Sequence, residues 1–427
     1  MKQRVAVIGG GWAGCAAALT LAEADVPVTL YEAGQTLGGR ARAITLDGHK
    51  LDNGQHILLG AYIQTLELMT RLHSADPEAG LMRLPLTIEQ PPDFCLACPT
   101  LPAPLNLLFG LVNARGLGWR EKWQAARWAT KTLRGSPQQA DTSVEEYLSG
   151  QSQQLRRLLW HPLCLSALNT LPESASSNTY QRVLAAAFAS RREHSDLLLP
   201  RHDLSALFPQ PAAARIEALG GTLRLSSRVL GLEPDGLGLS VRTRREADHF
   251  DRLILAVAPQ HLAMLGQQLP GLEASVDTVA GFRYEPIATA YLQYPAGVQL
   301  SRPMLALAEE PGQFVFDRGQ THGQAGLLAV VVSAASSLLG QPHDTWLDAV
   351  ETQLRRMISL PQPIWRRAVI EKQATYACVP TLKRPAVRTG NSRVFLAGDY
   401  TEGPYPATLE SATLSGLQSA QALLDSL

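Results

Sequence analysis

Residues 4–14, Arg-Val-Ala-Val-Ile-Gly-Gly-Gly-Trp-Ala-Gly, decide the fold that this sequence predicts. The apolar run 4–8 is typical of a short buried strand, and the alanine-rich run 13–24, which contains no proline, is typical of a helix. A second apolar run at 28–31 predicts another strand. Strand, glycine turn, helix and strand in this order form a right-handed βαβ unit. The sequence therefore predicts an α/β protein with a Rossmann-like dinucleotide-binding domain.

The turn after the first strand follows the pattern G-x-G-x-x-G, and its residues are Gly9, Gly11, Trp12, Ala13 and Gly14. In such a turn the first glycine permits the tight bend, the second lets a pyrophosphate approach the backbone, and the third lets the helix pack against the strand. The phosphates then face the helix N-terminus. At the end of the second strand, Glu32 can accept hydrogen bonds from a ribose hydroxyl, and it would repel a 2′-phosphate. We therefore expect a bound dinucleotide other than NADP.

The segment 37–42, Leu-Gly-Gly-Arg-Ala-Arg, favours FAD over NAD. It places the guanidinium of Arg40 beside Gly39, where the group can engage a pyrophosphate. The alternative is a simple basic turn.

The C-terminal end of the chain is expected to complete the cofactor site. An apolar strand at 393–397 runs into Gly398 and Asp399, and a closing helix is expected over 407–424. Amide groups that open this helix can stabilise negative charge on a reduced flavin, and Asp399 would meet the ribityl or phosphate portion. The helix residues assigned to the site are Ala407, Thr408 and Leu409.

A chain of 427 residues exceeds what one hydrophobic core usually serves, so two domains are expected. The FAD-binding domain is assigned to 1–80, 200–265 and 385–427. The remainder, 81–199 and 266–384, is assigned to a discontinuous α+β substrate domain.

Within the first domain, 220–225 and 253–257 are expected to be strands that flank a hairpin near 234–236 and extend the sheets. Val229, between the first of these strands and the hairpin, is assigned to the cofactor site as well.

Charge and cysteine content exclude several classes of function. The 38 basic and 38 acidic residues cancel, so no field draws a nucleic acid. Five irregularly spaced cysteines do not make a disulfide framework, which favours the cytoplasm. Cys95 and Cys98 have the spacing of a metal-ligand pair, but no second pair accompanies them. We therefore predict no metal site and no nucleic-acid partner.

Several segments together resemble a known family. Glu32 and Ala33 running into 38–40 resemble the flavin amine oxidase and phytoene desaturase superfamily, which binds FAD on this fold. Within it, the chain is similar to the squalene-associated FAD desaturases, on the segments 52–56, 160–164, 167–170 and 198–205. The resemblance implies a long apolar isoprenoid as substrate and the reduction of hydroxysqualene to squalene by reduced FAD. It does not identify the electron donor that reduces the flavin.

The resemblance also places Gly54, Gln55 and His56 beside the isoalloxazine ring. His56 is the first candidate for a catalytic group, because imidazole titrates near neutral pH. The alternative is that His56 only hydrogen-bonds the backbone and shapes the pocket. Asp52 and Glu402 are weaker acid candidates, since a carboxyl needs an apolar setting to stay protonated.

Three tyrosines can offer ring faces to an allylic cation, although core packing is the alternative for each. They are Tyr62, Tyr284 and Tyr405. Three other functions stay open: a carotenoid-type desaturase that oxidises an isoprenoid, a flavin amine oxidase, and a non-catalytic prenyl-lipid carrier. The direction of electron flow separates the first of these from the reductase.

The segment 105–134 is a candidate for peripheral contact with the inner face of the cytoplasmic membrane. Trp119 and Trp123 lie one helical turn apart, Trp128 lies off that face, and the apolar run 105–111 precedes them. Six basic residues accompany them: Arg115, Arg120, Lys122, Arg127, Lys131 and Arg134. The alternative is a helix whose tryptophans fill the core. No run in the sequence reaches the length of a membrane-spanning helix.

Overall fold

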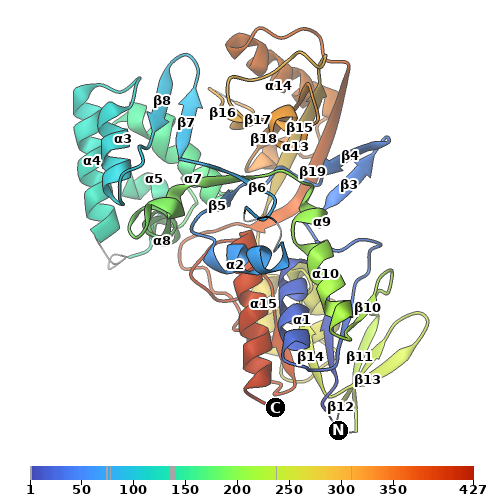
Figure 1. Ribbon diagram of the computed structural model, residues 1–427. Coiled ribbons are helices and arrows are strands. Elements are labelled where there is room, and N and C mark those ends of the chain that lie inside the picture. Colours follow the sequence, from blue (N-terminus) through green and yellow to red (C-terminus); the bar gives the residue numbers. More distant parts are fainter. Residues whose placement is uncertain (1, 74–75, 77, 135–139, 237, 309) are drawn as a thin grey trace.

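The computed structural model describes residues 2–73, 76, 78–134, 140–236, 238–308 and 310–427. Figure 1 shows two parts, with both chain termini at the lower end. The lower part is built on a parallel sheet. The upper part combines an antiparallel sheet with a group of helices. The division into two discontinuous domains with the boundaries given above stays a prediction.

A five-stranded parallel sheet joins the beginning, middle and end of the chain. Its strand order is β10-β2-β1-β14-β20. These are Thr222–Arg224, Val28–Tyr31, Val5–Ile8, Arg252–Leu255 and Val394–Leu396. All four neighbouring pairs are parallel, and β1 is buried on both faces, as expected of a parallel sheet between helices. The strands predicted near both chain ends are thus confirmed, and the C-terminal strand pairs with β14.

Helices α1 (Trp12–Glu23) and α15 (Leu409–Leu424) pack against each other beside this sheet. Their close approach depends on Gly416, where an added methyl carbon would lie 2.2 Å from the carbonyl oxygen of Ala13. The closing helix begins two residues later than the expected start at 407. Thr408 precedes it and caps it, because its hydroxyl accepts a hydrogen bond from the Ser411 amide.

The region 220–257 gives two kinds of strand. The first and last strands of this region, β10 and β14, belong to the parallel sheet, as predicted. The predicted hairpin belongs to a separate three-stranded antiparallel sheet, formed by β11 (Gly231–Asp235), β12 (Gly238–Arg242) and β13 (Ala247–Phe250).

The upper part contains a second five-stranded sheet, which is antiparallel and has the order β16-β17-β18-β15-β19. Its strands are Met304–Ala306, Phe314–Asp317, Leu327–Val332, Tyr284–Gln293 and Trp365–Tyr376. Alternate side chains of β15, Ala288, Ala290 and Leu292, pack with α14 (His343–Met357). Tyr291 belongs to the other apolar cluster, because neighbouring side chains of a strand point to opposite faces.

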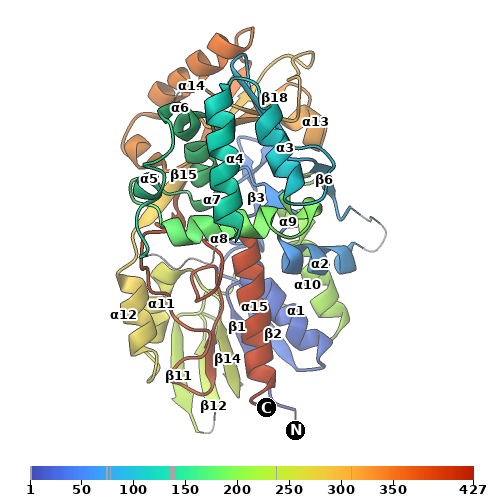
Figure 2. The ribbon, with the colours of Figure 1, turned by 90° about the vertical axis from the view of Figure 1, so that its left-hand side faces the viewer.

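Four longer helices form the remaining layer: α3 (Leu105–Asn113), α4 (Trp119–Arg134), α7 (His161–Leu168) and α8 (Ser177–Phe188). Figure 2 shows α3 and α4 side by side at the outer face. None of the helices that the structure describes is sufficiently long and apolar to span a bilayer. The other elements are α2 (Ile63–Leu72), β3 (Ala43–Leu46), β4 (His49–Asp52), β5 (Leu58–Leu59), β6 (Leu81–Leu84), β7 (Thr87–Gln90), β8 (Phe94–Ala97), α5 (Val144–Tyr147), α6 (Gln153–Leu155), β9 (Leu197–Pro200), α9 (Leu204–Leu207), α10 (Pro209–Ala218), α11 (Pro259–Gly266), α12 (Glu273–Ala280) and α13 (Arg318–His322).

Candidate active site

The glycine turn between β1 and α1 is closely packed at its two ends and open in the middle. Gly9 has a φ of +110°, and an added methyl carbon there would lie 2.4 Å from the carbonyl oxygen of Ala256. At Gly14 the same carbon would lie 1.9 Å from the carbonyl oxygen of Gly9. At Gly11 its only neighbour within 4 Å would be the Cα of Gly39, at 3.9 Å. The fold itself therefore requires glycine at 9 and 14 but leaves space at 11.

The N-terminus of α1 has the properties of a phosphate-binding site. Gly11 is its N-cap and offers no side-chain acceptor, and the first turn carries no acidic residue. Its free amide groups and the helix dipole therefore favour an anion. Trp12 is buried, and its indole donates to the carbonyl oxygen of Ala41 at 3.0 Å. Trp12 and Ala13 would therefore contribute their backbone amides, and not their side chains, to the predicted cofactor site.

Glu32 lies at the end of β2 beside the glycine turn. Its Oε2 accepts from the Gly10 amide at 2.8 Å, and its Oε1 accepts from the Gly34 amide at 2.7 Å. Each carboxylate oxygen keeps a lone pair for a ribose hydroxyl. The chain that follows β10 passes next to Glu32, because the Ser227 amide donates to the Glu32 carbonyl oxygen at 2.8 Å. Two residues later it reaches Val229, which is buried. Ala33 is exposed beside these groups.

Arg40 joins the N-terminal and C-terminal motifs. Its Nη2 lies 2.6 Å from Oδ1 of Asp399, and its Nη1 donates to the carbonyl oxygen of Ala374 at 2.7 Å. Gly398, immediately before Asp399, donates its amide to Oγ of Ser415 at 2.8 Å. The two motifs predicted to share one site thus meet, although Arg40 is bound by a carboxylate here. Its contact with a pyrophosphate stays a prediction.

The start of α15 faces the same region and is held by a buried carboxylate. Both oxygens of Glu410 accept backbone amides at the start of α2, from Gln64 at 3.0 Å and from Thr65 at 2.9 Å. The Thr408 hydroxyl accepts a hydrogen bond from the Ser411 amide. The remaining amides at the start of the helix, near Ala407 and Leu409, present the positive end of the helix dipole.

His56 is neutral at physiological pH in this setting. Burial lowers its pKa below the ordinary 6.5, although the hydrogen bond to Gly54 and the charge of Asp52 oppose this shift. Nδ1 lies 2.9 Å from the carbonyl oxygen of Gly54, and a carbonyl oxygen can only accept, so Nδ1 carries the proton. Nε2 is then an acceptor. The geometry favours the alternative in which His56 shapes the pocket.

Neither carboxyl candidate lies in an apolar setting free of charged partners or solvent, so their role as acids stays a prediction. Asp52 is buried and lies 2.9 Å from Nη1 of Arg318. Glu402 is exposed to solvent. Beside Asp52, burial and the charge of Arg318 lower the pKa of His322 to about 3. Sequence reasoning missed Arg318 and His322, because neither lies in a recognisable motif.

The three candidate tyrosines lie at two places in the site, Tyr284 near the Arg40–Asp399 pair and Tyr62 and Tyr405 near Glu410. Burial raises the pKa of Tyr62, Tyr284 and Tyr405, so all three hydroxyls keep their protons. Sequence reasoning missed Tyr400, which is buried next to Asp399 and packs its ring on Gly398. Among the described residues its hydroxyl has no hydrogen-bond partner. An orphaned polar atom near the Arg40–Asp399 pair fits a site that a polar cofactor completes.

Cys95 lies on β8 and Cys98 directly follows that strand. Burial raises the pKa of the Cys98 thiol to about 12. Across the part of the chain that the structure describes, no three His, Cys, Asp or Glu side chains are grouped to hold a metal ion.

The sequence profile of flavin containing amine oxidoreductases matches residues 12–424. The hydroxysqualene dehydroxylase of Sinorhizobium fredii is 27% identical, and the alignment covers 99% of each chain. A probable zeta-carotene desaturase of Synechococcus elongatus is 24% identical over 99% of this chain and 98% of its own.

Solved structures show the same fold. An oxidoreductase from Methanosarcina mazei has a TM-score of 0.76 at 14% identity, over 98% of this chain and 100% of its own. Cyclohexylamine oxidase from Brevibacterium oxydans has a TM-score of 0.71 at 17% identity, over 100% of this chain and 99% of its own. The predicted Rossmann-like fold and FAD cofactor are thereby confirmed. The chain belongs to the family of flavin-containing amine oxidoreductases and is an FAD-dependent oxidoreductase.

Proposed function

We propose that this oxidoreductase reduces hydroxysqualene to squalene. The observation that carries the proposal is the end-to-end similarity to hydroxysqualene dehydroxylases, at 27% identity to the protein of Sinorhizobium fredii and 28% to that of Rhodopseudomonas palustris. Replacing a hydroxyl by hydrogen needs a hydride at carbon and a proton on the departing oxygen, which leaves as water. Reduced FAD supplies the hydride when it is bound.

The residues of the chain then have to deliver a proton and exclude water. Neutral His56 and Asp52, which is paired with Arg318, are poorly suited to donate one. The hydroxyls of Tyr62, Tyr284 and Tyr400 remain protonated, since burial raises the pKa of each. We therefore propose that one of these tyrosine hydroxyls donates its proton to the departing oxygen as the C–O bond breaks, because hydroxide is a stronger base than a tyrosinate. Solvent returns the proton to the tyrosine after the water has left.

A carotenoid-type desaturase is the second candidate, because relatives named as zeta-carotene and 15-cis-phytoene desaturases also align over nearly the whole chain. A desaturase removes hydride from an isoprenoid and so reduces its flavin. The two functions therefore differ in the direction of electron flow.

The test is anaerobic incubation of the holoprotein, its flavin chemically reduced, with hydroxysqualene. We expect the flavin to reoxidise as squalene appears in the extracted lipid by mass analysis. An unchanged flavin and unchanged lipid would contradict the proposal. The oxidised holoprotein with phytoene is the comparison, and bleaching of the flavin there would favour the desaturase.

An apolar surface on α3 and α4 supports uptake of this substrate from a membrane. On α3, Leu105, Phe109 and Val112 follow helical spacing and are 46%, 50% and 40% exposed. On α4, Trp119 and Trp123 are 73% and 67% exposed. We call these five residues the lipid-facing surface. Core packing does not explain side chains so exposed, whereas interfacial helices carry them toward lipid.

Basic side chains accompany the lipid-facing surface, and the exposed ones are Arg115, Arg120, Arg127 and Lys131. Such residues are attracted to anionic lipid headgroups. A squalene-sized hydrocarbon is nearly insoluble in water. We therefore propose peripheral attachment to the inner face of the cytoplasmic membrane.

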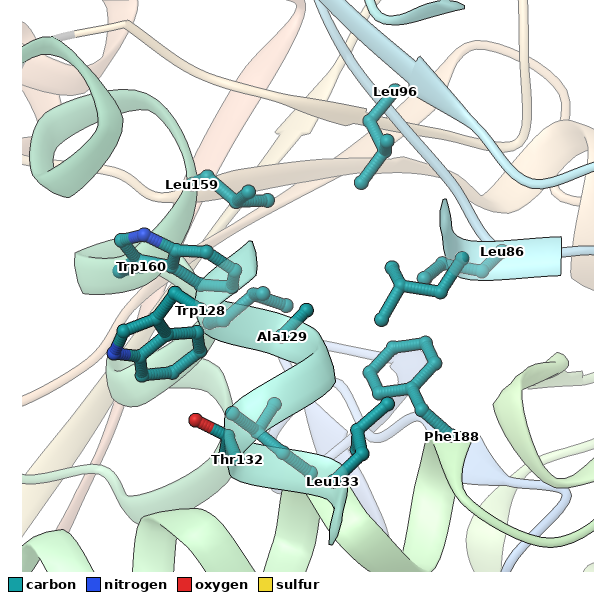
Figure 3. Close-up of a pocket in the computed structure, with 12 residues that line it drawn as sticks. Leu86, Leu96, Trp128, Ala129, Thr132, Leu133, Leu159, Trp160 and Phe188 are labelled. Atoms are coloured by element: carbon teal, nitrogen blue, oxygen red, sulfur yellow. The ribbon is translucent and has the colours of Figure 1, made fainter. Parts of the chain in front are cut away.

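The inner side of α4 is apolar as well. Trp128 points inward, with its ring centroid 4.3 Å from that of Trp160. It lines a small apolar cavity of about 10 Å³ together with Ala129, Leu133 and residues of neighbouring elements (Figure 3). The predicted position of Trp128 off the Trp119–Trp123 face is confirmed. Helix α4 thus carries apolar side chains on both its exposed and its inner side.

Reversing two charges beside the lipid-facing surface should release the protein from membranes. We expect Arg120→Glu/Arg127→Glu to lower co-sedimentation with anionic liposomes by about tenfold or more, because each basic residue near the surface contributes about 1 kcal/mol. Arg244→Glu/Arg245→Glu, in the exposed turn between β12 and β13, is the control with the same change in net charge. Equal sedimentation of both variants and the wild type would refute membrane contact.

A further inference from the structure

Arg318 is a buried arginine whose contacts converge on the segment 52–56. It begins α13 and is 1% exposed. Its Nη1 lies 2.9 Å from Oδ2 of Asp52 and donates to Oε1 of Gln55 at 3.0 Å. Its Nε donates to Oε1 of Gln324 at 2.6 Å. A single nitrogen, Nη1, thus binds both a carboxylate and an amide of the segment, while the Nε contact with Gln324 holds the planar guanidinium in place.

The Asp52 end of the segment is held from two further elements. Oδ1 of Asp52 accepts the amide of Leu204, at the start of α9, at 2.9 Å. The Asp52 carbonyl oxygen accepts the hydroxyl of Tyr291, on β15, at 2.9 Å. The guanidinium of Arg318 lies over the same tyrosine ring, 5.8 Å from its centroid. Three elements that are far apart in the sequence therefore fix one residue.

The next residue is tied to Arg40 and to the antiparallel sheet. The side-chain amide of Asn53 donates to the Arg40 carbonyl oxygen at 3.1 Å and to Oε2 of Glu371, on β19, at 3.0 Å. The Asn53 backbone amide donates to the carbonyl oxygen of Arg42 at 2.9 Å. The segment 52–56, which carries His56, is thus tied to Arg40, the residue that pairs with Asp399.

The charges in this cluster balance. Asp52 and Arg318 cancel each other in the interior, and Nε2 of the buried His322 lies 3.7 Å from the same carboxylate. That histidine is neutral, for the reasons given above. A buried ion pair adds little net stability compared with apolar side chains, and its best-supported use is to fix one arrangement of neighbouring elements.

We infer that Arg318 is a positioning residue, which binds Asp52 and Gln55 together and so holds His56 in the one orientation that the flavin reaction uses. The inference rests on the proposed function in one respect, the placement of 54–56 beside the isoalloxazine ring. Arg318 lies far from 52–56 in the sequence, and only the fold brings it to this segment.

The experiment compares Arg318→Lys, Gln55→Met and the double variant as holoproteins. Lysine keeps the charge that Asp52 needs but has no second donor in place of Nε, so it loses the contact with Gln324 that holds the group against both partners. We expect each single change to lower kcat with hydroxysqualene about tenfold at nearly constant KM, because small misplacements of reacting groups cost rate. The double variant should be no slower than the slower single variant, since both changes break one contact. Multiplying effects, or unchanged kcat in the single variants, would overturn the inference.

Visible circular dichroism of the bound flavin separates failure of this inference from failure of the proposed function. We expect Arg318→Lys and Gln55→Met to change that spectrum in the same way, whether or not hydroxysqualene is the substrate. The control is Arg366→Met, which removes an arginine that lies 3.2 Å from Glu351 at the far side of the antiparallel sheet. It should leave the spectrum and kcat unchanged. An unchanged flavin spectrum in the first two variants would also overturn the inference.

Discussion

Gly11→Ala is expected to abolish tight FAD binding while leaving the fold intact. A methyl carbon at Gly11 meets only the Cα of Gly39, at 3.9 Å, and the backbone there has φ −71° and ψ 179°, which any residue adopts. The glycine is therefore needed for the pyrophosphate rather than for the chain. We expect the Kd for FAD to rise about 100-fold, or roughly 2.7 kcal/mol, with the Tm of the apoprotein nearly unchanged. Titration of apoprotein with FAD and thermal unfolding measure the two effects.

Gly14→Ala is the matched control, because the same methyl group meets the fold there. It would lie 1.9 Å from the carbonyl oxygen of Gly9 and 3.1 Å from Cβ of Ala256. We expect the Tm of the apoprotein to fall in this variant. Wild-type FAD affinity in Gly11→Ala would show that the phosphates do not approach the backbone at this position.

Asp399→Ala is expected to separate the two ends of the cofactor site. The carboxylate is almost completely buried and lies 2.6 Å from Arg40, whose side chain is 31% exposed. Removing one partner of a buried pair leaves the other uncompensated, but solvent at Arg40 reduces the cost, so we expect a loss of about 2 kcal/mol in the free energy of unfolding. FAD affinity should fall as well. Chemical denaturation of the apoprotein and FAD titration measure both.

Lys2→Ala is the control for this change. Lys2 pairs with Asp25 on the surface of the same part of the protein, and both side chains are mostly exposed. Surface pairs contribute less than about 1 kcal/mol. Equal losses of stability in Asp399→Ala and Lys2→Ala would show that the Arg40–Asp399 pair does not join the two motifs.

The sequence alone determined the dinucleotide-binding half of this protein. Short apolar runs, a glycine turn and an alanine-rich helix are local patterns, and each follows from the geometry of a few neighbouring residues. The strands at 5–8, 28–31 and 394–396 were predicted within a residue or two. The same holds for α1, and α15 begins later than predicted only because Thr408 serves as its cap. FAD followed from the glycine motif and from the family resemblance.

Only the tertiary structure decided which distant residues meet. The pairing of β20 with β14, the Arg40–Asp399 pair and the contacts of Arg318 with Asp52 and Gln55 all join residues more than a hundred positions apart. Local periodicity carries no information about such partners, because burial and pairing depend on how complete elements pack. The same reason applies to the tryptophans of α4. Their spacing indicated one face, but only the packed fold shows that Trp119 and Trp123 face outward while Trp128 packs against Trp160.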